Sequence, residues 1–345
     1  MNRLLIRWIR FAAVAPSLLV CFASCAQGTP PPGHLHYDIA VELDPMRQYL
    51  STSVDLTFVS RTPGLREATF LLHRNLDVAG VEGEDVADHD FDRVTSVEIP
   101  WMPAAGRLIV SFNKPLDRGE PTSLHFEYGG VLDSWEPWSA NVFAEEWTEL
   151  GLYFPWFPFN YDEYGPFTYV VNVSIDSSFQ VFGMGEVEHT ILGWTLRGDR
   201  PANDIVLLAA RDLKTTRVES DGFEVQAAYT SLNVSAATRL AEDATSILRM
   251  YSNWLGVVES RQLSLVETKR EMGGGYARPG LIVLSRLAER TSPEHRADLM
   301  RYVAHEAAHF WWSLAPTASW EDWLNESFAE YSALLVLREV FGESE

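Results

Sequence analysis

Apolar and polar residues alternate along much of the segment from residue 34 to residue 215. The alternation is clearest in the runs 37–43, 54–58, 124–128 and 169–175. Short runs of this kind, separated by Pro, Gly and Asp, are typical of antiparallel strands with one face in the core and one face in water. We therefore expect residues 34–215 to form an antiparallel β-sandwich or saddle domain.

The pattern changes after residue 215, where longer helical stretches alternate with short apolar strands. Ser235 is a candidate N-cap, and Ser292 followed by Pro293 is a second helix start, because a hydroxyl caps free N–H groups and Pro fits the first helical position. The predicted helices run over about 235–255, 293–313 and 325–341, and the predicted strands over 223–229, 263–266 and 281–284. Residues 216–345 are thus expected to form a second domain, and the whole chain an α+β protein.

The stretch 135–167 is rich in aromatic residues and prolines. Flat rings fill irregular space in a core that bridges two domains, or they line one wall of a substrate cleft. The sequence leaves both interpretations open.

Residues 1–26 differ from the rest of the chain. Three arginines precede an apolar run from Phe11 to Ala23, and small residues follow it, which is the pattern of an export signal. The run is shorter than the ~20 residues that span a membrane, and an N-terminal membrane anchor is the alternative. Residues 27–33 are rich in Pro and Gly and predict a stiff tether.

Cys25 ends the stretch Phe22-Ala23-Ser24-Cys25, which resembles the bacterial lipobox, whose cysteine is lipidated. Cleavage after Ala26 is the alternative. Cys21 is the other cysteine, so the body that follows the leader has no disulfide and no thiolate ligand for a metal. We expect an exported protein of the bacterial periplasm or cell envelope, with no membrane contact other than a lipid anchor at Cys25.

The chain is acidic, with 48 Asp and Glu against 27 Lys and Arg and a formal net charge of −21. A surface of this charge repels phosphate backbones, so we expect no nucleic-acid partner. Hydrophobic residues make up 46% of the chain, which excludes a mostly disordered protein. The composition predicts nothing about the oligomeric state.

The chemically informative residues are His305-Glu306-Ala307-Ala308-His309, inside a predicted helix. Four residues advance a helix by about 400° and 6 Å, so His305 and His309 share one face and their imidazoles converge on a single cation. Neutral imidazoles in a tetrahedral site suit zinc, and a catalytic zinc keeps one position for water. Glu306 flanks that position as the base that takes a proton from the water and passes it to a leaving amine. Two surface histidines beside a helical acid are the alternative.

Two imidazoles need a third protein ligand, and Glu326 is the first choice. It lies in the first turn of the last predicted helix, where free backbone N–H groups favour a carboxylate. Glu330, one turn later, is the second candidate. Asp322 or Glu321 is placed to accept a hydrogen bond from a ligating imidazole and fix its tautomer, or else is ordinary surface charge.

These residues resemble the motifs of the aminopeptidase N family of zinc peptidases, which pair H-E-x-x-H with W-L-N-E-[GS]-F-A. His305, His309 and Glu326 match the family's zinc ligands, and Glu306 matches its general base. The resemblance implies one zinc ion per chain, peptide substrates, and a saddle-shaped β domain followed by a thermolysin-like catalytic domain. The interval from His309 to Glu326 is shorter than the family's usual one.

A second departure concerns the family's substrate loop, G-A-M-E-N. Its counterpart here is Gly274, Gly275, Tyr276, Ala277 and Arg278. Ala277 replaces the glutamate that binds the substrate's α-amine in the family, whereas Arg278 is suited to attract a carboxylate or a carbonyl. The resemblance therefore supports a zinc peptidase more strongly than an aminopeptidase. Glu145 or Glu146, from the β domain, is an alternative anchor for the amine.

Only 19 residues follow Glu326, and the family's transition-state tyrosine lies beyond them. The resemblance thus implies a catalytic domain truncated on its C-terminal side, in which Tyr276 or Arg278 would have to stabilise the oxyanion. Two functions follow as hypotheses. The first is a zinc metallopeptidase; the second is a catalytically weak or inactive periplasmic zinc protein that binds or scaffolds peptides.

Overall fold

The computed structural model describes residues 35–95, 97, 99, 102–135, 142–161, 165–258, 260–270, 274–290, 292–313 and 321–342. The predicted leader, the lipidation candidate Cys25 and the predicted tether lie outside the described residues. No helix within the described ranges is long and apolar enough to cross a membrane.

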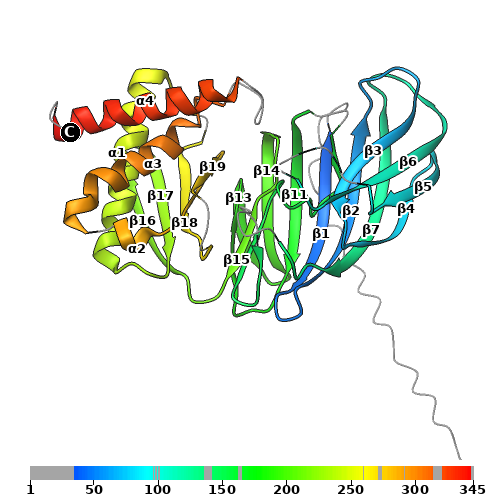
Figure 1. Cartoon of the computed structure of the whole chain (residues 1–345), viewed down its shortest axis with the longest axis horizontal. Helices are drawn as coiled ribbons and strands as arrows, with labels where there is room; N and C mark the ends of the chain where they lie inside the picture. The colour runs from blue at the N-terminus through cyan, green and yellow to red at the C-terminus, as the bar shows by residue number, and fades with distance from the viewer. Residues whose placement is uncertain are drawn as a thin grey trace, which may run out of the picture. The chain divides into compact units, whose positions relative to one another are not determined.

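A seven-stranded sheet forms the largest part of the N-terminal half (Figure 1). Its strand order is β13 (Glu186–Thr190), β14 (Gly193–Ala202), β11 (Phe167–Ser174), β1 (His36–Asp44), β2 (Tyr49–Val59), β7 (Pro121–Val131) and β4 (Asp77–Glu82). Neighbouring strands are antiparallel, as the alternation predicts, except that β1 and β11 are parallel. Burial alternates along β1 and β2, so one face of the sheet lies in the core.

Two four-stranded sheets complete this half. One has the order β10 (Phe159–Asn160), β3 (Leu65–His73), β6 (Ala105–Leu116) and β5 (Val86–Asp92). The other has the order β12 (Gln180–Gly183), β15 (Leu207–Ala210), β9 (Trp147–Leu150) and β8 (Val142–Phe143). The three sheets share one hydrophobic core. The aromatic stretch contributes Trp156 and Phe157 to that core, fully buried, while Tyr153 lines a cleft.

The C-terminal half is built on a five-stranded sheet with the order β16 (Lys214–Ser220), β17 (Phe223–Tyr229), β18 (Gln262–Glu267), β20 (Leu281–Leu284) and β19 (Tyr276–Arg278). The predicted boundary after residue 215 falls inside β16. Strand β20 reads Leu-Ile-Val-Leu and is buried on both faces. Ile282 and Leu284 pack with the helices, whereas Leu281 and Val283 belong to the core of the N-terminal sheets. This sheet therefore lies between two hydrophobic cores.

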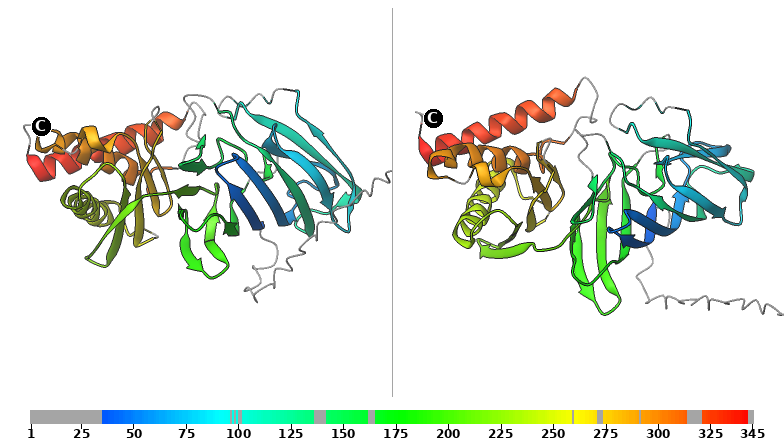
Figure 2. Two further views of the ribbon diagram at one scale, coloured as in Figure 1. Left: turned by 90° about the horizontal axis from the view of Figure 1, so that it is seen from below. Right: turned by 60° about the horizontal axis from the view of Figure 1, so that its bottom comes forward.

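Two long helices, α1 (Val234–Leu255) and α3 (Arg296–Ala308), lie against one face of the five-stranded sheet, and a third, α4 (Asp322–Phe341), packs against α3. Both views in Figure 2 show α4 running alongside α3. A short helix α2 (Leu287–Arg290) and a 3-10 turn (Pro293–His295) connect β20 to α3. The mixed architecture agrees with the predicted α+β class.

The ends of the predicted helices need correction. Asn233, not Ser235, caps α1, because its side chain accepts a hydrogen bond from the backbone N–H of Ala236 at 2.9 Å. Gly256 ends α1 as predicted, with a φ of 104°.

The predicted second helix, 293–313, is shorter in the structure. Its first residues form the 3-10 turn, and the α-helical pattern ends at Ala308, because the N–H groups of Phe310 and Trp311 bond to carbonyls three residues back. The last helix begins at Asp322, three residues before the predicted start at Asn325.

A buried ion pair connects the two halves. Glu149 on β9 is fully buried and accepts hydrogen bonds from Trp147 Nε1 at 2.9 Å, Thr268 Oγ1 at 2.6 Å and Arg270 Nε at 2.9 Å. Arg270 is also buried, and it donates to the carbonyl of Gly274 at 3.1 Å. Arg270 thus links Glu149 on β9 to Gly274, two residues before β19.

Candidate metal centre

The last turn of α3 and its C-cap residue carry two imidazoles on one face. The buried residues of this helix, including Met300, Val303 and Ala307, fix its orientation against the sheet. His305 and His309 are one turn apart and their ring centroids are separated by 5.1 Å. The predicted convergence of the two rings is therefore present in the structure.

Glu326, in the second turn of α4, faces both rings. Its Oε2 lies 3.2 Å from His305 Nε2, and its Oε1 lies 3.6 Å from His309 Nε2. One donor atom from each of the three residues lies within 4.8 Å of the other two. Tetrahedral zinc with bonds of about 2.0–2.1 Å would place neighbouring donor atoms about 3.3 Å apart. The donor set and its spacing therefore fit a zinc ion, despite the short interval between His309 and Glu326.

The outer nitrogens of both rings are already engaged. His305 Nδ1 lies 3.2 Å from Oε2 of Glu330, and His309 Nδ1 lies 3.1 Å from the carbonyl oxygen of Trp312. An Nδ1–H that donates in this way leaves the Nε2 lone pair for a metal. Burial also lowers the pKa of His309, which favours the neutral form that ligation needs.

Glu330 therefore lies on the outer side of His305, not beside Glu326 as a further ligand. The tautomer-fixing position that the sequence analysis gave to Asp322 or Glu321 is occupied by Glu330 at one ring and by a backbone carbonyl at the other. Asp322 instead accepts a hydrogen bond from Asn325 Nδ2 at 3.0 Å.

Glu306 is buried beside the two rings, and its side chain contributes to the wall of the cleft described below. Loss of hydration raises the pKa of Glu306 from 4.5 to about 8, the negative charge of Glu326 adds to this rise, and Arg278 opposes it. A carboxyl group with this pKa exchanges a proton readily near neutral pH.

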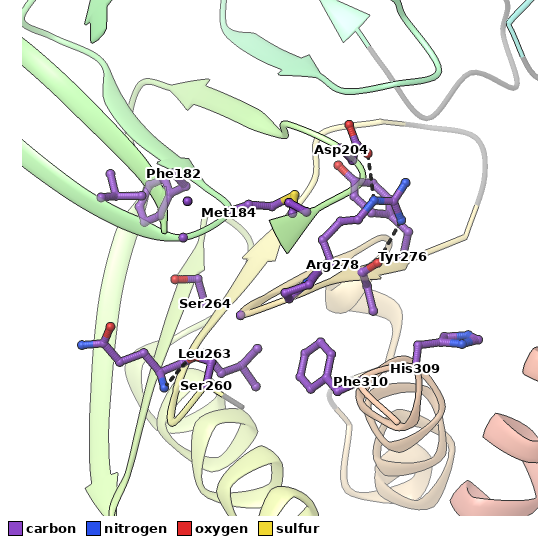
Figure 3. Close-up of a pocket in the computed structure, with 18 of the residues that line it drawn as sticks. Phe182, Met184, Asp204, Ser260, Leu263, Ser264, Tyr276, Arg278, His309 and Phe310 are labelled. Carbon is purple, nitrogen blue, oxygen red and sulfur yellow. Dashed lines mark hydrogen bonds and ion pairs between the residues drawn. The ribbon is translucent and has the colours of Figure 1, made fainter. Parts of the chain in front are cut away.

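A cleft of about 1570 Å³ opens at the metal-ligand candidates. Its walls come from the end of α3, the start of α4, strand β19 and the strands β13 and β14. Figure 3 shows Arg278 and Asp204 on one side of this cleft, with His309 and Phe310 projecting from the end of α3. Of the predicted substrate loop, Gly275, Tyr276, Ala277 and Arg278 line the cleft, whereas Gly274 is not among the lining residues.

Arg278 is held in place by several groups. Its Nε donates to Asp204 Oδ2 at 2.8 Å, and its Nη1 donates to the Ala277 carbonyl at 2.9 Å. The guanidinium also lies over the rings of Tyr153 and Tyr276, at 5.6 and 5.4 Å from their centroids. The predicted cation is thus present at the cleft, already paired with a carboxylate.

The other substrate-loop candidates differ in their surroundings. A Cβ on Gly275 would lie 2.5 Å from the hydroxyl of Tyr302, whereas one on Gly274 would meet nothing within 4 Å. The hydroxyl of Tyr276 is buried and does not reach the solvent of the cleft. Glu146 pairs with Arg211 at 3.3 Å, and neither Glu145 nor Glu146 is among the described residues that line the cleft.

Three features of the site were not predicted from the sequence: Arg301, Asp204 and the contact between Glu330 and His305. The sequence spacing could have indicated Arg301 and Glu330, because Arg301 is four residues before His305 and Glu330 is four residues after Glu326. Side chains four residues apart share one face of a helix, so two helices that face each other bring all four side chains together. Asp204 is 74 residues from Arg278, and nothing in the sequence links them.

No protein-family model matches the chain. Among curated proteins, the chain is similar to Probable aminopeptidase 1 of Sulfurisphaera tokodaii, with 30% identity over 111 residues. The match covers 30% of this chain and 14% of that relative, so the chain spans a small part of the relative's length.

Solved structures give a broader match. An M1 zinc metallopeptidase from Deinococcus radiodurans, in a mutant form bound to the substrate Tyr-Ser-Ala, is similar with a TM-score of 0.66 and 20% identity. A second structure of the M1 zinc metallopeptidase from that organism gives 0.63 and 19%. These matches cover 90% of this chain and 72% and 71% of the two neighbours.

The chain therefore has the fold of the M1 zinc metallopeptidases. This result confirms, for the fold, the resemblance to the aminopeptidase N family that the motifs indicated, and with it the α+β class.

Proposed function

We propose that this protein is a zinc-dependent metallopeptidase that hydrolyses peptide bonds in the cleft beside α3. The observation that carries the proposal is the convergence of His305 Nε2, His309 Nε2 and the Glu326 carboxylate, with Glu306 buried next to them. The fold match and the name of the curated relative support a peptidase.

The three ligand candidates would hold one zinc ion. Bound there, zinc would lower the pKa of water and polarise a carbonyl oxygen. Glu306 would accept the proton of the attacking water on its carboxylate and donate it to the leaving amine nitrogen. Its partial desolvation suits this exchange, because a carboxylate of ordinary pKa is a much weaker base near neutral pH.

The wall of the cleft bears on which peptides are cleaved. Ala277 offers no carboxylate to a substrate ammonium group, and Arg278 is paired with Asp204. The name of the curated relative supports an aminopeptidase, whereas Ala277 favours a peptidase that does not require a free amino terminus. We propose the latter, with peptides as the substrate class.

The test uses a peptide library and two forms of the purified protein, the native one and Glu306→Gln. Native protein is expected to cleave peptides, to lose this activity with a chelator and to recover it with zinc. Glu306→Gln is expected to bind the same amount of zinc and to lose hydrolysis. Native protein that retains peptides in a zinc-dependent way, without products, would replace the peptidase by the peptide-binding alternative.

We also propose export to the bacterial cell envelope, on the basis of the predicted leader. A native chain in the membrane fraction and a Cys25→Ser chain in the soluble periplasmic fraction would support lipidation. Both chains in the soluble fraction would argue for ordinary signal cleavage, and both in the membrane fraction would argue for an N-terminal membrane anchor.

A further inference from the structure

The two candidate zinc-binding histidines are held by different kinds of group. His309 donates from Nδ1 to a backbone carbonyl of its own segment, that of Trp312. His305 Nδ1 lies 3.2 Å from a side-chain carboxylate oxygen on another helix, Oε2 of Glu330. The orientation of His305 therefore depends on a side chain that a substitution can remove.

Glu330 is itself held by a second partner. Arg301 Nε lies 2.6 Å from Glu330 Oε1, and Arg301 Nη2 contacts the same oxygen. The two oxygens are thus divided, with Oε1 facing the guanidinium and Oε2 facing His305. A carboxylate fixed at one oxygen presents the other in a defined direction.

The geometry follows from two helix repeats. Arg301 and His305 are one turn apart on α3, and Glu326 and Glu330 are one turn apart on α4. Because α4 lies alongside α3, Glu326 reaches the Nε2 side of the His305 ring while Glu330 reaches its Nδ1 side. The ring is therefore held between two carboxylates of one helix.

An ordinary interhelical salt bridge is the competing explanation. The side chains of Arg301 and Glu330 are 50% and 33% exposed, and ion pairs with this much exposure contribute little to stability. A role in stability alone therefore predicts a small effect on folding and no effect on the metal ligands. A role through His305 also predicts a small effect on folding of the metal-free chain, but it predicts weaker zinc binding when Glu330 is removed.

We propose that Glu330, fixed by Arg301, is a positioning residue that holds His305 in the tautomer with Nδ1–H and a free Nε2. The inference rests on the proposed zinc site, but not on catalysis. Groups that orient a ligating histidine typically change metal affinity by about 10–100-fold when they are removed.

The test measures the zinc dissociation constant of the whole chain by competition with a chromophoric chelator. Glu330→Ala is expected to weaken zinc binding about 10–100-fold. Glu330→Gln, which keeps an acceptor oxygen but no charge, is expected to fall between Glu330→Ala and the native chain. Arg301→Gln leaves the carboxylate in place but frees it, so a smaller loss is expected. Glu339→Ala, at an exposed position of the same helix, is the matched control and should bind as the native chain does.

Two further readouts separate positioning from folding. The absorption spectrum of the cobalt(II)-loaded Glu330→Ala chain should differ from that of the native chain, because the geometry at the ligand changes. The melting temperature of the metal-free variant should stay close to native. Zinc affinity within twofold of native in Glu330→Ala, with an unchanged cobalt spectrum, would overturn the inference.

The outcomes also separate this inference from the proposed function. If the native chain binds zinc tightly but cleaves no peptide, the peptidase proposal is wrong, and the zinc affinities of the Glu330 variants still test the positioning role. If the native chain cleaves peptides and the Glu330 variants all bind zinc as the native chain does, the peptidase proposal stands and the positioning role is wrong. If Glu330→Ala does not fold, Glu330→Gln and Arg301→Gln decide the question.

Discussion

The ion pair between Glu149 and Arg270 gives the sharpest prediction about stability. Glu149→Gln preserves the shape of the side chain but removes the negative charge that faces the guanidinium. Glu149 is 0% and Arg270 3% exposed, so the substitution would take a carboxylate partner away from a buried guanidinium. Breaking a buried pair in this way typically costs about 3–5 kcal/mol.

Burial, rather than distance, sets this magnitude, and the chain contains a matched control. Arg93 and Asp77 are 2.7 Å apart, closer than the 2.9 Å of the buried pair, but their side chains are 42% and 78% exposed. Asp77→Asn is therefore expected to change the free energy of unfolding by less than about 1 kcal/mol.

The assay is urea denaturation of the metal-free protein. Unfolding is monitored with two spectroscopic probes, and coincident curves indicate a single transition. Replacing both partners, with Glu149→Leu and Arg270→Met, should recover only part of the loss, because an apolar pair leaves no buried charge but removes the acceptor of Trp147 Nε1 and Thr268 Oγ1. A Glu149→Gln protein within 1 kcal/mol of native would refute the reasoning, as would equal effects of Glu149→Gln and Asp77→Asn.

Three further predictions concern residues in or next to the cleft. Ala277→Glu should raise kcat/KM for peptides with a free amino terminus about 10–100-fold, because one charged hydrogen bond contributes ~1.5–3 kcal/mol. The kcat/KM for N-acetylated peptides should stay unchanged. Equal changes for both kinds of peptide would contradict this prediction. Gly275→Ala should destabilise the fold by about 1–3 kcal/mol, because its Cβ would lie 2.5 Å from the Tyr302 hydroxyl, whereas Gly274→Ala should be neutral in the same urea titration. Because the pKa of Glu306 is raised from 4.5 to about 8, its protonated form stabilises the metal-free fold fully below pH 4.5, and this contribution is lost as the pH rises through 8. Glu306→Gln should remove that decline from urea titrations between pH 4.5 and 8; an unchanged decline would assign it to other groups.

Much of the fold was readable because it follows from local periodicity. Alternation along β1 and β2 predicts their buried faces, and Gly256 marks the end of α1. The errors lie where local signals compete. Asn233 and Ser235 are both good N-caps, and only the path of the chain decides that Asn233 accepts the hydrogen bond. The parallel pairing of β1 with β11 joins segments about 130 residues apart, which no short pattern encodes.

The candidate site likewise has one part that the sequence predicts and one part that depends on tertiary packing. The spacing of His305 and His309 fixes their shared face before any tertiary contact forms, since one helical turn determines it. The approach of Glu326 to both rings depends on the packing of α4 along α3, and the sequence supplied only the motif that suggested it.

Features that depend on a few neighbouring residues can be predicted from the sequence. They are the alternating strands, the helical turn that brings two imidazoles to one face, and the place of Glu306 beside them. Contacts between segments far apart in the sequence are set by the tertiary structure. The pairs Glu149–Arg270 and Asp204–Arg278, and the contact of Glu330 with His305, all belong to this group. The reason is physical: a backbone repeat sets the direction of a side chain within a few residues, but the partner it meets is chosen by the packing of whole sheets and helices.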